Sequence, residues 1–213
     1  MPTERICIVG AGGHARVVAD ALLCANPSAV ETLCFVDDRP GLHGGTLLGR
    51  PIVGPIAVAG RADTLFHVAI GAADSRERLQ RELIAAGARP LTIVHPRAVI
   101  SAHAVVGAGS FVAAGAIIAP LARIGDGVIV NHAAVVDHDC EVGAWSHIGP
   151  HATLGGSVYI GSGVLIGANA TVLPGKRVGA RATIGAGAVV VRDAAEGAVC
   201  RGVPARERDE RNS

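Results

Sequence analysis

The sequence predicts two domains: an α/β domain over residues 1–95 and a parallel β-helix over residues 96–206. Three observations lead to this prediction. The first part alternates short apolar strands with helices, an aliphatic residue recurs at every sixth position from 100 to 190, and glycine follows many of these positions. The last residues, 207–213, are mostly charged or polar and are expected to form a flexible tail.

The composition indicates what kind of side chains fill the core and which classes of partner are excluded. The chain has 213 residues, half of them apolar but only 2% aromatic, so small and branched side chains must fill the interior, which favours layered β structure. The formal net charge of +1 argues against binding to nucleic acid or to an anionic membrane, since both need clustered basic residues. No apolar stretch has the length of a signal peptide core or a membrane span, so we expect a cytoplasmic protein without membrane insertion.

The five cysteines are widely spaced and form no C-x-x-C pair. They are Cys7, Cys24, Cys34, Cys140 and Cys200. An odd number without paired spacing argues against a disulfide framework or a zinc ribbon. We therefore expect reduced, mostly buried thiols.

The N-terminal domain begins as a βαβ unit. A strand over 6–9 is followed by a glycine-rich turn and an amphipathic helix. Further strands are expected over 33–36 and 67–70, and Asp74 and Glu77 have the spacing of a capping box at the start of a second helix. This is half of a doubly wound, Rossmann-like fold.

The glycine-rich turn, residues 10–15, suits a phosphate. Glycines let the backbone approach closely, and the helix N-terminus that follows offers unpaired N–H groups. A tight packing turn without a ligand is the alternative. An NAD site with Asp37 at the ribose is a rival, but about 90 residues are too few for both dinucleotide-binding halves, so a mononucleotide-type ligand is favoured.

The six-residue repeat determines the architecture of the second domain. Sixteen consecutive repeat positions from Ile100 to Val190 are aliphatic, without an insertion. One such unit cannot bury its apolar face alone, but stacked units form a parallel β-helix. The register resembles that of the hexapeptide-repeat acyltransferases. The resemblance implies a left-handed triangular prism with three hexads per coil, and hence about five coils.

Polar and titratable residues concentrate in one segment of the repeat. They are Asn131, His132, Asp137, His138, Asp139, His147 and His151. Acyl transfer needs a base, a group that orients it and an N–H donor for the oxyanion. His138, with Asp139 or Asp137, can supply the first two. Gly156 is expected to stack on His138 one coil later, where the Gly155–Gly156 pair presents backbone N–H groups.

Several segments together resemble the PglD and NeuD type of bacterial sugar acetyltransferase. These segments are Asn131-His132, Val136 to Cys140, Ser146-His147, Gly155-Gly156, Gly202 to Arg206, Gly10 to His14 and Asp37-Asp38. The resemblance implies acetyl transfer from acetyl-CoA to the amino group of a nucleotide-linked amino sugar, for cell-surface glycan synthesis. It also implies a homotrimer with active sites between subunits and no metal.

The resemblance assigns roles to individual residues. His138 is the general base, Asp139 polarises it and the Gly156 N–H stabilises the oxyanion, while Asn131 and His147 contact the reacting groups. Relatives often have Glu beside their catalytic histidine, whereas this chain has the shorter Asp on both sides of His138. Whether Asp137 or Asp139 orients the imidazole therefore stays open. The nucleotide sugar is expected near Gly12, Gly13, His14 and Asp37, and coenzyme A near Gly155, Ala168, Lys176, Ala186 and Arg206.

Three alternatives remain at this point. A sugar O-acetyltransferase of the sialic-acid type would use the same histidine, and the sequence does not separate it from an N-acetyltransferase. A zinc-dependent β-helix hydratase could take its ligands from His103, His132, His138 and His147. A non-catalytic scaffold with a nucleotide-binding domain is the third.

Overall fold

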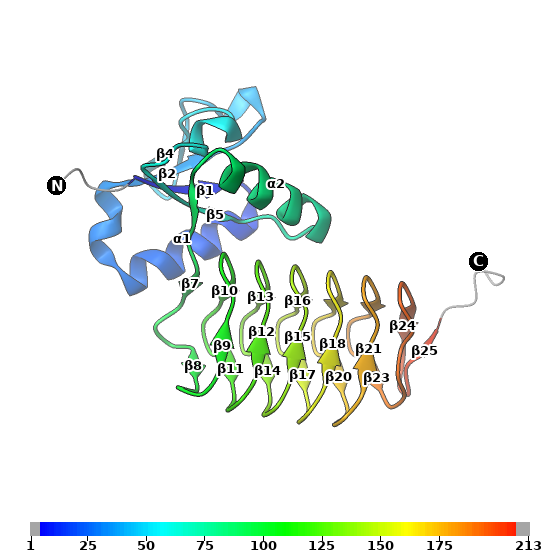
Figure 1. Ribbon diagram of the computed structural model, residues 1–213. Coiled ribbons are helices and arrows are strands. Elements are labelled where there is room, and N and C mark those ends of the chain that lie inside the picture. The colour runs from blue at the N-terminus through cyan, green and yellow to red at the C-terminus, as the bar shows by residue number, and fades with distance from the viewer. Residues whose placement is uncertain (1–4, 208–213) are drawn as a thin grey trace. The chain divides into compact units, whose positions relative to one another are not determined.

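A computed structural model describes residues 5–207, so the predicted tail lies outside the described residues except for Glu207. The chain divides into two compact units (Figure 1). One contains residues 1–96 and 108–111, and the other contains 97–107 and the residues from 112 onward. Among the described residues, none of the helices is long and apolar enough to cross a membrane.

The first unit is built on a parallel four-stranded sheet with the order β2-β1-β5-β6. Its strands are β1 (Arg5–Val9), β2 (Leu33–Val36), β5 (Thr64–Val68) and β6 (Arg89–Pro90), with a hairpin of β3 (Thr46–Leu47) and β4 (Arg50–Pro51). The helices are α1 (Gly13–Ala25) and α2 (Ala73–Ala85), with short 3-10 turns η1 (Pro27–Glu31), η2 (Pro40–Leu42) and η3 (Ile56–Ala59). Val9, Val36, Phe66, Leu79 and Leu83 belong to its core. The predicted Rossmann-like class is confirmed.

Two local predictions in this unit were wrong. The strand expected over 67–70 is β5, which spans Thr64–Val68. Beyond Ala69, the buried Arg76 guanidinium donates hydrogen bonds to the carbonyls of Ile70 and Gly71, so these carbonyls bond a side chain instead of a neighbouring strand. The expected capping box does not form: the N-cap of α2 is Ala72, without a side-chain cap, and Asp74 lies inside the first turn.

The second domain is the predicted left-handed prism of parallel strands. One sheet contains β7 (Ile93–Val94), β10 (Phe111–Val112), β13 (Ile129–Val130), β16 (His147–Ile148), β19 (Leu165–Ile166), β22 (Thr183–Ile184) and β24 (Val199–Arg201), with β25 (Arg206–Glu207) antiparallel at its end. The second contains β8 (Val99–Ile100), β11 (Ile117–Ile118), β14 (Val135–Val136), β17 (Thr153–Leu154), β20 (Thr171–Val172) and β23 (Val189–Val190). The third contains β9 (Val105–Val106), β12 (Arg123–Ile124), β15 (Glu141–Val142), β18 (Tyr159–Ile160) and β21 (Arg177–Val178).

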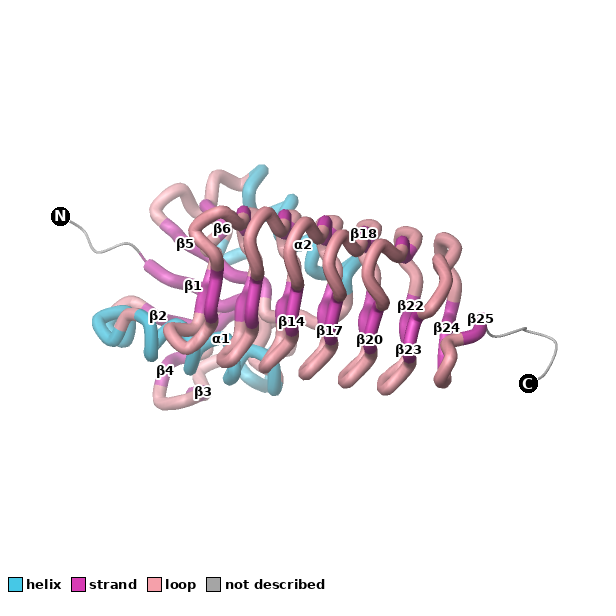
Figure 2. Tube along the Cα trace, turned by 90° about the horizontal axis from the view of Figure 1, so that it is seen from below, coloured by secondary structure: helices cyan, strands magenta, loops and turns pink. Residues whose placement is uncertain are grey.

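From β8 to β23, each strand is two residues long, and its second residue is the aliphatic repeat position. These side chains point inward and stack, as Val136 and Leu154 do in the register of β14 with β17. Figure 2 shows β14, β17 and β20 running side by side along one face. The coils number about six, not about five, because β7 precedes the uninterrupted repeat and β24 follows it.

Candidate active site

A tight turn between β14 and β15 carries His138. Its next residue, Asp139, has φ +58, a left-handed conformation that Asp and Asn adopt more readily than most residues. This places Asp139 Oδ2 2.8 Å from His138 Nδ1. Asp137 is used differently, because its Oδ1 accepts the backbone N–H of His138 at 2.7 Å. Asp139 is therefore the carboxylate that contacts the imidazole.

The carboxylates set the chemistry of the imidazole. The hydrogen bond that His138 donates to Asp139, assisted by the charge of Asp137, raises the pKa of His138. If Nδ1 carries the proton donated to Asp139, the lone pair of Nε2 faces outward as a base. The side chain is 57% exposed in the free chain, so a substrate can reach it.

Gly156 lies directly against His138, one coil further on. A Cβ on Gly156 would stand 2.5 Å from both Cε1 and Nε2 of the imidazole, closer than any side chain allows. Ser157 N–H donates to the His138 carbonyl at 2.8 Å, which keeps the two turns in register. The Gly156 N–H makes no hydrogen bond to another residue of the described chain, so it remains available as a donor. The structure thus brings His138, Asp139 and Gly156 together as the repeat predicts.

Asn131 and His147 form a second polar pair at a different corner of the prism. Asn131 begins the turn between β13 and β14, and its Nδ2 lies 3.1 Å from His147 Nε2. Its Oδ1 accepts the backbone N–H of His132 at 2.8 Å. Within one chain, these two residues therefore do not meet His138, whose turn lies at the next corner.

The residues expected near coenzyme A divide between the same two corners. Ala168 and Ala186 continue the Asn131 corner upward, since Cβ atoms on Gly149 and Gly167 would come within 2.9 and 2.5 Å of their respective backbone nitrogens. Gly155 and Lys176 lie at the His138 corner, in its next two coils. Arg206 lies apart from both, exposed in β25.

The glycine-rich turn of the first unit is open. Gly12 is the N-cap of α1 and Gly13 its first residue, and a Cβ on either would meet no atom within 4 Å. No packing inside the chain requires glycine there, which leaves room for an approaching ligand. His14 follows, with its ring edge-on to Phe111 at a centroid distance of 5.6 Å.

Asp37 fixes this turn from the end of β2. Its Oδ2 accepts the Ala11 N–H at 2.9 Å, and the Arg39 guanidinium lies 2.8 Å from both carboxylate oxygens. The hydrogen bond with Arg39 is the main cause that holds the pKa of Asp37 far below its usual range. The carboxylate is already occupied by these donors, so its established contacts are those that shape the turn.

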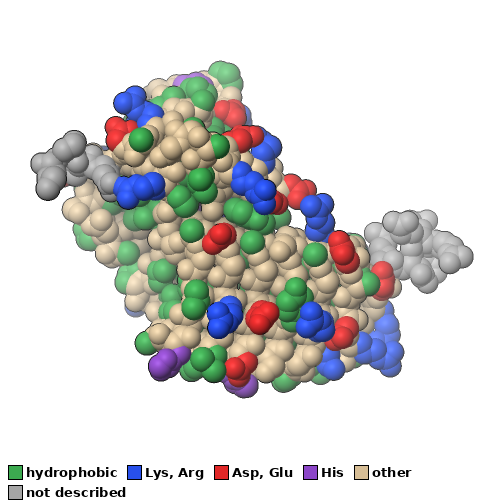
Figure 3. All heavy atoms as spheres, viewed as in Figure 1, with side chains coloured by type: hydrophobic (Ala, Val, Ile, Leu, Met, Phe, Trp, Pro, Cys, Tyr) green, Lys and Arg blue, Asp and Glu red, His purple; other side chains and the backbone are tan. Residues whose placement is uncertain are grey.

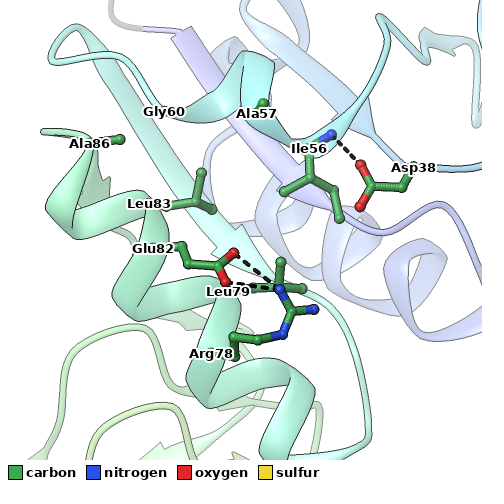
Figure 4. A pocket seen from close by; sticks show the side chains of 9 residues that line it. All are labelled: Asp38, Ile56, Ala57, Gly60, Arg78, Leu79, Glu82, Leu83 and Ala86. Atoms are coloured by element: carbon green, nitrogen blue, oxygen red, sulfur yellow. Dashed lines mark hydrogen bonds and ion pairs between the residues drawn. The ribbon is translucent and has the colours of Figure 1, made fainter.

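The neighbouring Asp38, which sequence reasoning did not assign a role, borders a cleft of about 320 Å³ between η3 and α2 (Figure 4). Its Oδ1 accepts the Ile56 N–H at 2.9 Å. Leu79 and Leu83 form an apolar wall, and Arg78 pairs with Glu82 at the rim. The only signal in the sequence was the Asp pair itself, since the cleft depends on how η3 packs.

The histidines do not assemble a metal site within the described chain. Among residues 5–207, no three His, Cys, Asp or Glu side chains come together in an arrangement that could hold a metal ion. His132 and His138, two of the histidines considered for a hydratase, lie in turns at different corners.

Two domain families match successive parts of the chain. The signature of the PglD N-terminal domain matches residues 5–83, and that of the GMPPB C-terminal domain matches residues 88–183. A comparison with curated proteins finds no match.

Solved structures resemble the whole chain. PerB from Caulobacter crescentus, in complex with CoA and GDP-perosamine, is 37% identical with a TM-score of 0.89, over 96% of this chain and 97% of that one. A histidine-to-asparagine variant of perosamine N-acetyltransferase from the same organism, with the same two ligands, is 36% identical over 97% of each chain with a TM-score of 0.90. The acetyltransferase domain of PglB from Neisseria gonorrhoeae, in complex with acetyl coenzyme A, is 36% identical with a TM-score of 0.90, over 96% of this chain and 99% of that one.

The likeness thus extends over both domains, at an identity well above that at which a fold alone is shared. An N-terminal PglD domain and a β-helix with a His-Asp-Gly corner occur here in one chain. The chain belongs to the family of PglD-type sugar acetyltransferases.

Proposed function

We propose that this acetyltransferase transfers the acetyl group of acetyl-CoA to the amino group of a nucleotide-linked amino sugar, with His138 as general base. The observation that carries the assignment is the contact of His138 with both Asp139 and Gly156. Relatives more than a third identical bind CoA together with GDP-perosamine, which supports this class of acceptor.

The corner supplies each requirement of the reaction. His138 Nε2 takes a proton from the sugar amine as its nitrogen attacks the thioester carbonyl. The carbonyl oxygen becomes an oxyanion, which accepts a hydrogen bond from the Gly156 N–H. When the carbon–sulfur bond breaks, the CoA sulfur leaves as a thiolate and takes up the proton held by His138. Asp139 stabilises the imidazolium during this step.

A homotrimer would complete the site. The outer surface of the sheet from β8 to β23 is mostly aliphatic, with Val99 63% and Ile117 41% exposed, and its polar residues are Thr153 and Thr171. The sheet containing β12, β15 and β21 instead presents Arg123, Glu141 and Arg177 outward, and Figure 3 shows acidic and basic side chains interspersed on the visible face. An exposed apolar face of this kind marks an interaction site.

This apolar face is bounded by the His138 corner on one edge and the Asn131 corner on the other. If three such faces surround a common axis, the His138 corner of one subunit meets the Asn131 corner of the next. His147 and Asn131 would then contact the substrate across the interface. Ala168 and Ala186 would line the path of coenzyme A there, with Gly155, Lys176 and Arg206 as further contacts.

The first unit is assigned the nucleotide. Gly12 and Gly13 give space at the N-terminus of α1, which favours a diphosphate, and Asp37 holds the turn in shape. His14 is assigned to the nucleotide or its phosphates, and Asp137 is assigned to the substrate near His138. A reducing compartment, the cytoplasm, suits the buried Cys7 and Cys34 thiols, whose sulfurs lie 3.2 Å apart without a disulfide.

The test is release of CoA thiol from acetyl-CoA, measured across UDP-, GDP- and dTDP-linked amino sugars. We expect turnover with one of these amino sugars and an acetamido product, identified by mass spectrometry. Free sialic acid serves as the hydroxyl control. Turnover with the hydroxyl acceptor alone would establish the O-acetyltransferase alternative and contradict the proposal.

A further inference from the structure

Cys140 lies inside the prism, at a position where the repeat usually places alanine. The equivalent buried residues two places before the aliphatic position include Ala116, Ala122, Ala134, Ala152, Ala170, Ala182 and Ala188. The prism therefore tolerates a methyl group at this place in most coils. A fully buried thiol at 140 is not needed to fill space, so its hydrogen bonding has to explain it.

The thiol changes how the next coil turns. Turns that end in alanine close directly: Ala152 N–H donates to Gly149 at 3.1 Å, and Ala170 N–H donates to Gly167 at 3.1 Å. No such direct bond joins Val158 to Gly155 within the described chain. Cys140 Sγ instead donates to the Gly155 carbonyl at 3.1 Å, and the Val158 N–H is directed to the sulfur. The thiol bridges the two groups that would otherwise bond to each other.

This bridge acts on the peptide group that faces His138. The Gly155 carbonyl and the Gly156 N–H belong to one planar amide, so holding the oxygen fixes the direction of the hydrogen. Direct closure, as in the alanine turns, would rotate that amide. We infer that Cys140 is a positioning residue that aims the Gly156 N–H at the oxyanion. The inference rests on the function proposed above.

A second copy of the same bridge lies away from His138. Ser146 Oγ donates to the Gly161 carbonyl at 2.8 Å and accepts the Val164 N–H at 3.1 Å. The sequence offset from donor to carbonyl is the same, fifteen residues. The amide that Ser146 holds has no assigned part in the reaction. Ser146→Ala is therefore a matched control for loss of a bridge.

The experiment compares C140A, C140S and S146A with the wild type, using kcat and KM from CoA release and the melting temperature of each protein. We expect C140A to lower kcat about tenfold, a fraction of the loss found when an oxyanion donor is removed. KM for both substrates should stay within about twofold, because the oxyanion that accepts the Gly156 N–H forms only after the amine attacks. C140S, which keeps a donor and an acceptor, should restore most of kcat.

The control separates positioning from stability. C140A and S146A should lower the melting temperature by similar amounts, while S146A keeps the wild-type kcat. The acid limb of the pH–rate profile should not move in C140A, because Asp139 sets the basicity of His138. Wild-type kcat in C140A, or an equal loss of kcat in S146A, would overturn the inference. A wild-type protein that transfers no acetyl group would instead overturn the proposed function, and this inference with it.

Discussion

At the scale of single residues, the two aspartates beside His138 have different tasks because the backbone bends between them. Asp139 adopts a positive φ and turns its carboxylate back to the imidazole, while Asp137 accepts the N–H of His138. In the sequence, the cluster of titratable residues made His138 the candidate base, and the period of the repeat predicted that Gly156 stacks on it. The sequence left the choice of carboxylate open, because that choice depends on the conformation of one turn.

Replacing Asp139 with asparagine should move the pH dependence of the reaction. The carboxylate raises the pKa of His138, so D139N should lower that pKa, and the acid limb of kcat/KM should shift to lower pH. The plateau should also fall, since a weaker base accepts the proton less readily. D137N is the comparison variant. We expect a smaller shift of the acid limb, because Asp137 affects the pKa of His138 through its charge, without a hydrogen bond to the imidazole. An acid limb that D139N leaves in place would contradict this role.

Gly156→Ala should reduce acetyl transfer because the new side chain would clash with His138. The added methyl group would stand 2.5 Å from the imidazole, so His138 must leave its contact with Asp139. We expect a loss of kcat of about 10² or more. Gly175→Ala is a control, because its Cβ would meet no atom within 4 Å, although its φ of +69 costs some stability. Equal kcat values for G156A and the wild type would show that the close contact is not required.

At the scale of elements, the strands of the long repeat were predicted more accurately than the short elements of the first unit. The hexads repeat many times, so every predicted aliphatic position from 100 to 190 lies in a strand. In the first unit, β2 spans the predicted residues, but β5 and the start of α2 were misplaced. The buried Arg76 bonds the Ile70 carbonyl, which the prediction had assigned to the strand. Single tertiary contacts of this kind leave no periodic trace.

The strand β5 also carries a buried titratable group with a consequence for stability. Burial lowers the pKa of His67 to about 4, and its Nδ1 bonds the Leu91 carbonyl at 2.9 Å. The fold prefers the neutral ring, so stability is fully present above about pH 6.5 and is lost as the pH falls toward 4. When the pH falls from 7.5 to 5, the free energy of unfolding of the wild type should decrease by on the order of 2 kcal/mol more than that of H67Q. Denaturant unfolding at both pH values measures this difference. An equal decrease in the free energy of unfolding of the two proteins would contradict this role of His67.

At the scale of the whole molecule, one chain carries the residues of the proposed site at two separate corners. His138 and Gly156 occupy one, and Asn131 and His147 the other. The family resemblance implied sites between subunits, and the separation of the corners gives that implication a geometric reason. The hexad register of the sequence already places residues 131 and 138 in consecutive turns, but it does not show that a neighbouring subunit would bring the two corners together.

Assembly should therefore depend on the apolar face between these corners. Ile117→Asp places a charge in the centre of the proposed interface, so we expect a monomer and loss of acetyl transfer, with mass measured by light scattering. Val105→Asp adds the same charge on the face that already carries charged residues, and this variant should remain trimeric. A trimeric and active I117D would show that another face makes the interface.

The most direct test of the account is the rate of acetyl transfer in a single turnover by His138→Ala, at saturating acetyl-CoA and nucleotide-linked amino sugar. We expect the rate to fall by about 10²–10⁴ relative to wild type, while the variant still binds CoA in calorimetry and has the mass of a trimer in light scattering. A rate within tenfold of wild type would contradict the role of His138 as general base.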